Sequence, residues 1–85
     1  MLFNEKLIAE RANEFAARVL REVGEKPEAA LNRAFWLALA RPATSEERKL
    51  TLQYLDTQTA KGNFRTALAD VCHSLFNINE FIYVD

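Results

Sequence analysis

The stretch from Phe64 to Phe76, "FRTALADVCHSLF", has the most regular pattern of apolar residues in the chain and decides the fold class. Its apolar residues recur three and four positions apart, the spacing that places side chains on one face of an α-helix. They are Phe64, Ala67, Leu68, Val71, Cys72, Leu75 and Phe76. The stretch therefore predicts an amphipathic helix that buries this face in a protein core.

Three further segments with helical spacing precede this stretch, so the sequence predicts an all-α domain. Gly24 and Pro27 separate the first two segments, since glycine favours the end of a helix and proline its first turn. Pro42 ends the second segment, and Thr44 with Glu47 forms a capping box at the start of the third. The predicted helices cover residues 5–23, 27–41, 45–60 and 64–77.

The second and third helices differ in the width of their apolar surface. The second contains "AFWLALA" and is apolar nearly all round, which is typical of a helix in the middle of a bundle. Phe35 and Trp36 are expected to be core residues, with interface anchors as the alternative. The third helix is expected to be the most exposed, because its apolar stripe consists only of Leu50, Tyr54 and Leu55.

An apolar tail is expected after the fourth helix, over residues 78–85. The side chains of Asn77 and Asn79 compete with helical hydrogen bonding, which favours an end to the helix near this point. The residues that follow are β-prone, but no partner strand is visible elsewhere in the chain. The prediction is a single domain, residues 1–85, built as a four-helix bundle with an extended tail. The tail packs on its own bundle or on a partner.

Composition excludes several classes of function. The 85 residues suffice for one domain, and 11 basic against 12 acidic residues leave no basic stripe for nucleic-acid phosphates. No apolar run approaches the roughly 20 residues that a membrane span needs. The single cysteine excludes an internal disulfide and any all-cysteine metal site. We therefore expect neither nucleic-acid binding nor membrane insertion, and the compartment is not predicted.

Cys72 and His73 are the one pair that suggests nucleophilic catalysis. Adjacent residues of a helix point about 100° apart, so the two side chains do not face each other, and Cys72 belongs to the apolar face. Asp70 and His73 share a helix face and could form a local hydrogen bond, but two ligands do not make a zinc site. We therefore expect a buried cysteine, a half-exposed histidine, no enzyme activity, no metal and no cofactor.

Residues near the ends of the second and fourth helices are the candidates for interaction. Arg41 is expected to bind the terminal carbonyls of its helix or, as the alternative, the carboxylates of Asp85. Asn77, Asn79 and Glu80 either turn the chain or recognise a partner backbone. The full set of possible interaction residues is Arg41, Asn77, Asn79, Glu80, Phe81, Tyr83 and Asp85.

Two stretches, at residues 34–47 and 67–85, carry motifs found together elsewhere. "AFWLALARPATSEE" is similar to a leucine-rich helix ending in Gly-Arg-Pro-x-Thr and an acidic pair, with Ala40 in place of the glycine. "ALADVCHSLFNINEFIYVD" is similar to an alanine–aspartate–cysteine helix followed by Asn-x-Asn-Glu-Phe-x-Tyr-Val-Asp. Together they resemble the C-terminal part of large planctomycete proteins that join a cytochrome-c-like domain to planctomycete-specific domains of unknown function. The matching positions of the second motif are Ala69, Asp70, Cys72, Asn77, Asn79, Glu80, Phe81, Tyr83, Val84 and Asp85.

The resemblance implies a terminal module of a larger protein and supplies no activity. The haem attachment motif is absent from this chain, so no haem is expected. The predicted function is a non-catalytic packing or protein-interaction domain whose partner is the remainder of a larger parent protein. The alternative is an accessory domain that completes an electron-transfer or hydrolytic site supplied by other domains. DNA binding through a helix-turn-helix is disfavoured, because "ARPATSEE" presents acidic residues where a recognition helix needs basic ones.

Overall fold

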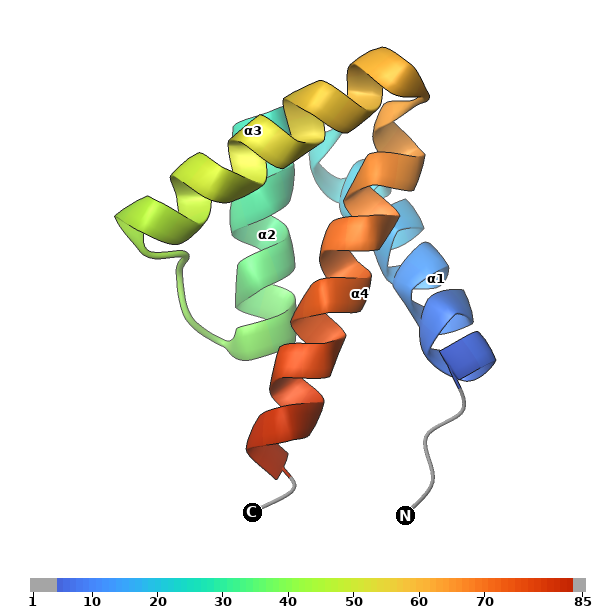
Figure 1. Ribbon diagram of the computed structural model, residues 1–85, viewed down its shortest axis with the longest axis vertical. Helices are drawn as coiled ribbons and strands as arrows, with labels where there is room; N and C mark the ends of the chain where they lie inside the picture. The colour runs from blue at the N-terminus through green and yellow to red at the C-terminus, as the bar shows by residue number, and fades with distance from the viewer. Residues whose placement is uncertain (1–4, 84–85) are drawn as a thin grey trace.

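A computed structural model describes the backbone of residues 5–83 and the side chains of residues 6–77 (Figure 1). The described chain is all-helical and contains no β-strand, which confirms the predicted fold class. Its elements are α1 (Glu5–Val23), α2 (Pro27–Leu39), α3 (Ser45–Lys61) and α4 (Phe64–Tyr83). None of these helices, over the described residues, combines the length and apolar character that a membrane span requires.

The central element is α4, which packs against each of the other three helices. The helices α1, α2 and α4 run along the long direction of the molecule, and α3 crosses over the others at one end (Figure 1). Within the described residues α1 and α3 do not pack against each other. The helix α2 likewise packs against each of the other three, as expected for a helix in the middle of the bundle.

The outer face of α2, however, stays exposed. Its buried residues lie on one side and are Ala30, Leu31, Ala34 and Phe35. Trp36 lies on the opposite side of the helix, 100° beyond Phe35, and its surface is 53% exposed. Phe35 is a core residue as predicted, whereas the prediction of a core position for Trp36 is wrong. The helix α2 thus carries apolar residues on nearly all sides, but only one side of it is buried.

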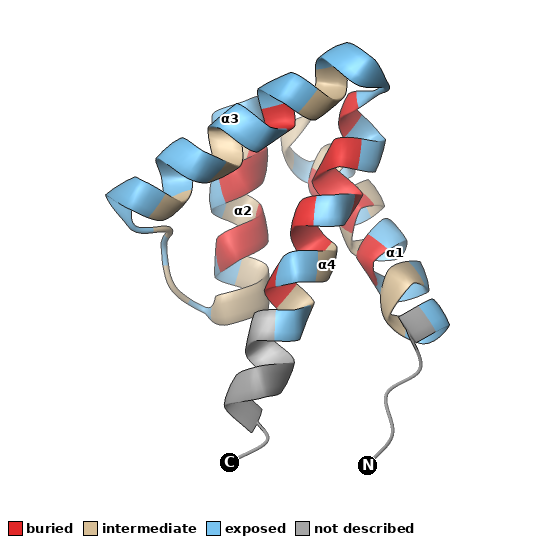
Figure 2. Cartoon of the chain, in the orientation of Figure 1, coloured by how far each residue is buried: buried red, intermediate tan, exposed pale blue. Residues whose placement is uncertain are grey.

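The core lies along the inner face of α4, where the predicted apolar stripe is buried (Figure 2). Leu68 and Cys72 are fully buried there, and Phe76 meets Phe15 of α1 edge to face with 5.0 Å between the ring centroids. The helices α1, α2 and α4 all contribute small side chains, which let helix backbones approach closely. The buried alanines are Ala12, Ala16, Ala30, Ala34, Ala67 and Ala69. By contrast, α3 buries only Leu55 among its described side chains, which confirms that it is the most exposed helix.

The fourth helix continues to Tyr83, so an extended tail from residue 78 is wrong for residues 78–83. Val84 and Asp85 lie outside the described residues. The physical reason lies in the spacing of Leu75, Ile78 and Ile82, which continues the helical rhythm at intervals of three and four. The weak helix propensities of the two asparagines did not outweigh this pattern.

The turn after α2 has an unusual backbone conformation at Ala40. This residue caps the helix with φ 58° and ψ 32°, and its N–H donates to the carbonyl of Trp36. The left-handed region is unfavourable for a residue with a Cβ atom, and glycine is the usual residue at this position. The chain therefore turns sharply at Ala40, at a conformational cost.

Replacing Ala40 with glycine is expected to raise the free energy of unfolding by about 1 kcal/mol, because glycine adopts this conformation without steric strain. The measurement is the midpoint of urea denaturation followed by circular dichroism. Ala17→Gly is the matched control: Ala17 lies inside α1, where glycine is expected to cost about 1 kcal/mol. Equal destabilisation by both substitutions would contradict the left-handed turn.

Candidate functional site

A hollow of the described surface lies where α3 and α4 meet the C-terminal half of α2. Its volume is about 510 Å³, within the range of ligand sites, and it is open to solvent. We name it the α3–α4 groove. It is lined by Phe35, Glu47, Leu50, Thr51, Tyr54, Asp70, Val71, His73, Ser74, Leu75 and Asn77.

Exposed apolar side chains form the α3 wall of the groove. Leu50 is 61% exposed and Tyr54 is 40% exposed, although α3 otherwise presents polar and charged residues to solvent. Val71 and Leu75 of α4 are buried beneath them and complete an apolar lining. The apolar side chains of this groove are thus only partly covered by the domain itself.

A hydrogen bond joins the two helices across the groove. The hydroxyl of Tyr54 donates to Oδ2 of Asp70 at 3.0 Å. Burial and the neighbouring Asp70 carboxylate together raise the pKa of Tyr54 above its ordinary value, so this hydroxyl keeps its proton. The bond holds one carboxylate oxygen of Asp70 in a fixed direction.

An ion pair closes the end of the groove near the α2–α3 turn. Nη1 and Nη2 of Arg41 donate to Oε1 and Oε2 of Glu47 at 2.8 and 2.9 Å, a bidentate arrangement. Arg41 also donates to the carbonyl of Pro42, and its guanidinium lies 6.0 Å from the ring centroid of Phe35. The guanidinium is thereby held between α3 and the end of α2.

Glu47 serves the helix and the ion pair at the same time. Its Oε1 accepts from the backbone N–H of Thr44, and its own N–H donates to Oγ1 of Thr44, which confirms the predicted capping box. The bonds from Arg41, and then the one from the Thr44 backbone, lower the pKa of Glu47 to about 2. Glu47 therefore stays ionised at any physiological pH.

The stability of the domain is expected to depend on pH through Glu47. Because the folded pKa of about 2 lies below the ordinary 4.5, the contribution of Glu47 is complete above pH 4.5 and is lost as the pH falls towards 2. Glu47→Gln keeps the capping geometry but removes the charge, so it should be less stable than the wild type by up to about 1 kcal/mol at pH 7. Thermal unfolding at pH 7 and pH 2.5 tests this.

In that experiment the difference in stability between the wild type and Glu47→Gln should be smaller at pH 2.5 than at pH 7. Glu46→Gln is the control, because Glu46 lies in the same helical turn and forms no ion pair within the described residues. If the stability difference is the same at both pH values, or if Glu46→Gln changes stability with pH in the same way, the ion pair does not stabilise the fold.

The structure brings two of the predicted interaction residues to the groove. Asn77 lines it and is exposed, and Arg41 stands at its end. Arg41 binds Glu47 and the Pro42 carbonyl instead of the predicted terminal carbonyls of α2. Asp85, the alternative partner, lies outside the described residues. Four further predicted residues lie within α4, but their side chains are outside the described part of the chain. They are Asn79, Glu80, Phe81 and Tyr83.

The cysteine–histidine pair behaves as expected for a structural role. Cys72 is fully buried, and burial raises the pKa of its thiol to about 12, which opposes formation of the thiolate. His73 is half-buried and lines the groove instead. Asp70 pairs with Tyr54 and forms no hydrogen bond with His73, so that predicted local bond is wrong. Among the described residues, no group of three or more His, Cys, Asp and Glu side chains could hold a metal ion.

Comparison with protein-family models, with curated proteins and with solved structures gave no match to this chain.

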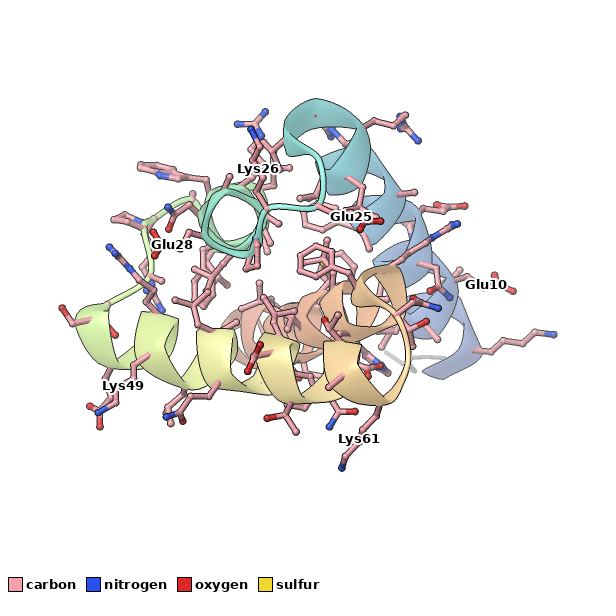
Figure 3. All side chains as sticks on the ribbon, turned by 90° about the horizontal axis from the view of Figure 1, so that it is seen from above. Glu10, Glu25, Lys26, Glu28, Lys49 and Lys61 are labelled. Atoms are coloured by element: carbon pink, nitrogen blue, oxygen red, sulfur yellow. The ribbon has the colours of Figure 1, made fainter. Side chains whose placement is uncertain are left out.

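A second, larger hollow of about 760 Å³ lies at the end of the molecule where α2 begins. Figure 3 looks onto this end and shows Glu25, Lys26 and Glu28 around the start of α2. Asp56 of α3 adds a third carboxylate to its lining. A helix start favours anions, whereas the three carboxylates favour cations, so the charges of this hollow oppose each other. The α3–α4 groove, whose two carboxylates Glu47 and Asp70 are both held by hydrogen bonds, is therefore the better candidate site.

The pairing of Tyr54 with Asp70 is the functional feature that sequence reasoning missed. The two residues lie 16 positions apart on different helices, and only the crossing of α3 over α4 brings them together. A signal was present in α3, where a leucine and a tyrosine one turn apart interrupt a polar helix that has little core to cover. Such residues suggest a contact beyond the helix itself.

Proposed function

We propose that this domain is a non-catalytic protein-interaction module that binds another polypeptide in the α3–α4 groove. The observation that carries the proposal is the exposure of Leu50 and Tyr54 on the groove wall, above the apolar residues of α4. Exposed apolar patches mark interaction sites, and tyrosine is enriched among the residues that dominate binding at protein interfaces.

The state of the ionisable groups also favours binding over chemistry. Glu47 is engaged by Arg41 and by the Thr44 backbone, and its pKa of about 2 is far below that of a general base at neutral pH. Cys72 lies in the core with a raised pKa, and a nucleophile needs the opposite environment. The groove thus offers contact surface and fixed polar groups.

The partner that we propose is the remainder of a larger protein. The resemblance of residues 34–47 and 67–85 to the end of large multidomain planctomycete proteins supports this choice. In such a protein the module would join a neighbouring domain by burying its groove, and an apolar wall would then no longer face water.

The test is a selection of binding peptides from a random phage-displayed library on the immobilised domain, followed by calorimetric titration of the selected peptides. Leu50→Glu is expected to weaken their binding at least tenfold, because it places a charge on the apolar wall. Folding should be unaffected, since Leu50 is 61% exposed. Circular dichroism melts of the variant check this point.

Leu7→Glu is the matched control, since Leu7 is 48% exposed on α1, which does not pack against α3. It should bind the peptides like the wild type. If no peptide is selected, or if Leu50→Glu binds the selected peptides unchanged, the groove is not an interaction site and the proposal fails.

A further inference from the structure

We infer that the partner of the α3–α4 groove presents a lysine or arginine to Asp70, about one helical turn away from an apolar side chain that packs against Leu50. This inference rests on the proposed function and names the chemistry of the partner. Its basis is the distribution of charge and apolar surface within the groove.

Asp70 carries the one formal charge of the groove lining that is not neutralised within the described residues. The other carboxylate, Glu47, is already bound by both terminal nitrogens of Arg41. Asp70 receives only the neutral hydroxyl of Tyr54 and forms no ion pair in the described structure. The lysines of α3 do not supply one, because Lys49 and Lys61 point away from the other helices (Figure 3). A cationic partner side chain is therefore the electrostatic complement.

The geometry of Asp70 suits a guanidinium or an ammonium group. The Tyr54 bond occupies one lone pair of Oδ2 and leaves Oδ1 to accept from a ligand. Because the bond also fixes the carboxylate, less conformational entropy is lost when a cation binds. The rim next to it is uncharged: Ser74 and Asn77 of α4 are exposed and form no side-chain hydrogen bond in the described structure.

The spacing of the two contacts follows from α3. Leu50 and Tyr54 are four residues apart, so they lie about 6 Å apart along the helix axis, and Asp70 is fixed to the Tyr54 end. A partner that contacts both points needs an apolar and a basic side chain with the same separation. Residues i and i+4 of a helix provide it. Phosphate-bearing ligands are unsuitable, because they would meet the negative charge of Asp70.

The experiment uses the peptides selected on the wild-type domain. We expect them to share a large apolar residue and a lysine or arginine three or four positions away. Asp70→Asn should weaken their binding about tenfold, and replacing the basic residue of the peptide by alanine should remove the difference between the two proteins. Asp56→Asn is the matched control, since Asp56 is an exposed carboxylate of α3 outside the groove.

A charge swap gives a second, independent readout. Asp70→Lys should reject the selected peptides and bind versions in which glutamate replaces the basic residue, and circular dichroism verifies that the variant is folded. If Leu50→Glu abolishes binding but Asp70→Asn does not change it, the inference is wrong and the proposed function stands. If Leu50→Glu has no effect either, both fail.

Discussion

Replacing Leu68 with alanine is expected to lower the free energy of unfolding by about 2–5 kcal/mol. Leu68 is fully buried on α4, the helix that packs against the other three, so the truncation leaves a cavity where all the helices depend on contact. For a domain of this size the melting temperature should fall by more than about 10 °C. Chemical denaturation followed by circular dichroism at 222 nm measures the effect.

Leu50→Ala provides the matched control for this experiment. The same atoms are removed from a helix surface that is already 61% exposed, so the change should stay within about 0.5 kcal/mol. The difference between the two leucine variants thus measures the burial at the centre of the fold. A loss of less than about 1 kcal/mol for Leu68→Ala would contradict the central position of α4.

The thiol of Cys72 should react with a water-soluble disulfide reagent at least about a thousandfold more slowly in the native protein than in the denatured chain. With a pKa of about 12, only about one thiol in ten thousand is ionised at pH 8, whereas a free cysteine of pKa about 8.5 is about one quarter ionised. Burial among core side chains reduces access further. The measurement is the rate of colour development at pH 8 with and without denaturant.

The positive control for that experiment is Ser74→Cys in a Cys72→Ala background. Ser74 is exposed on the same helix, so its replacement should react at nearly the rate of the denatured chain. Rapid reaction of native Cys72 would contradict the buried position and would reopen the possibility of a nucleophilic cysteine next to His73.

The sequence predicted the individual helices well, because their boundaries are set by local interactions. Thr44 and Glu47 cap α3 in the predicted manner, and Gly24 adopts a positive φ of 77° just after α1. The same local reasoning failed beyond residue 77, where two asparagines suggested an end to the helix. There the helical spacing of the apolar residues, which continues through Ile78, predicted the helix correctly.

The relations between helices could not be predicted in this way. The exposed position of Trp36 depends on which side of α2 the other helices cover, and nothing in the period of α2 itself decides this. Similarly, Arg41 had a nearby carboxylate in Glu47, but their pairing depends on how the turn between α2 and α3 brings the two side chains together. The candidate site therefore became visible only once α3 was placed across α4.

The central position of α4 has a consequence for synthesis on the ribosome. Residues 5–61 leave the exit tunnel before α4 does, and without α4 the contacts available to them are those of α2 with α1 and with α3. Without α4, each of the three earlier helices lacks a helix that it packs against in the complete fold. The nascent domain therefore cannot complete its core before residues 64–76 emerge, and until then the apolar faces of the earlier helices are open to non-native contacts.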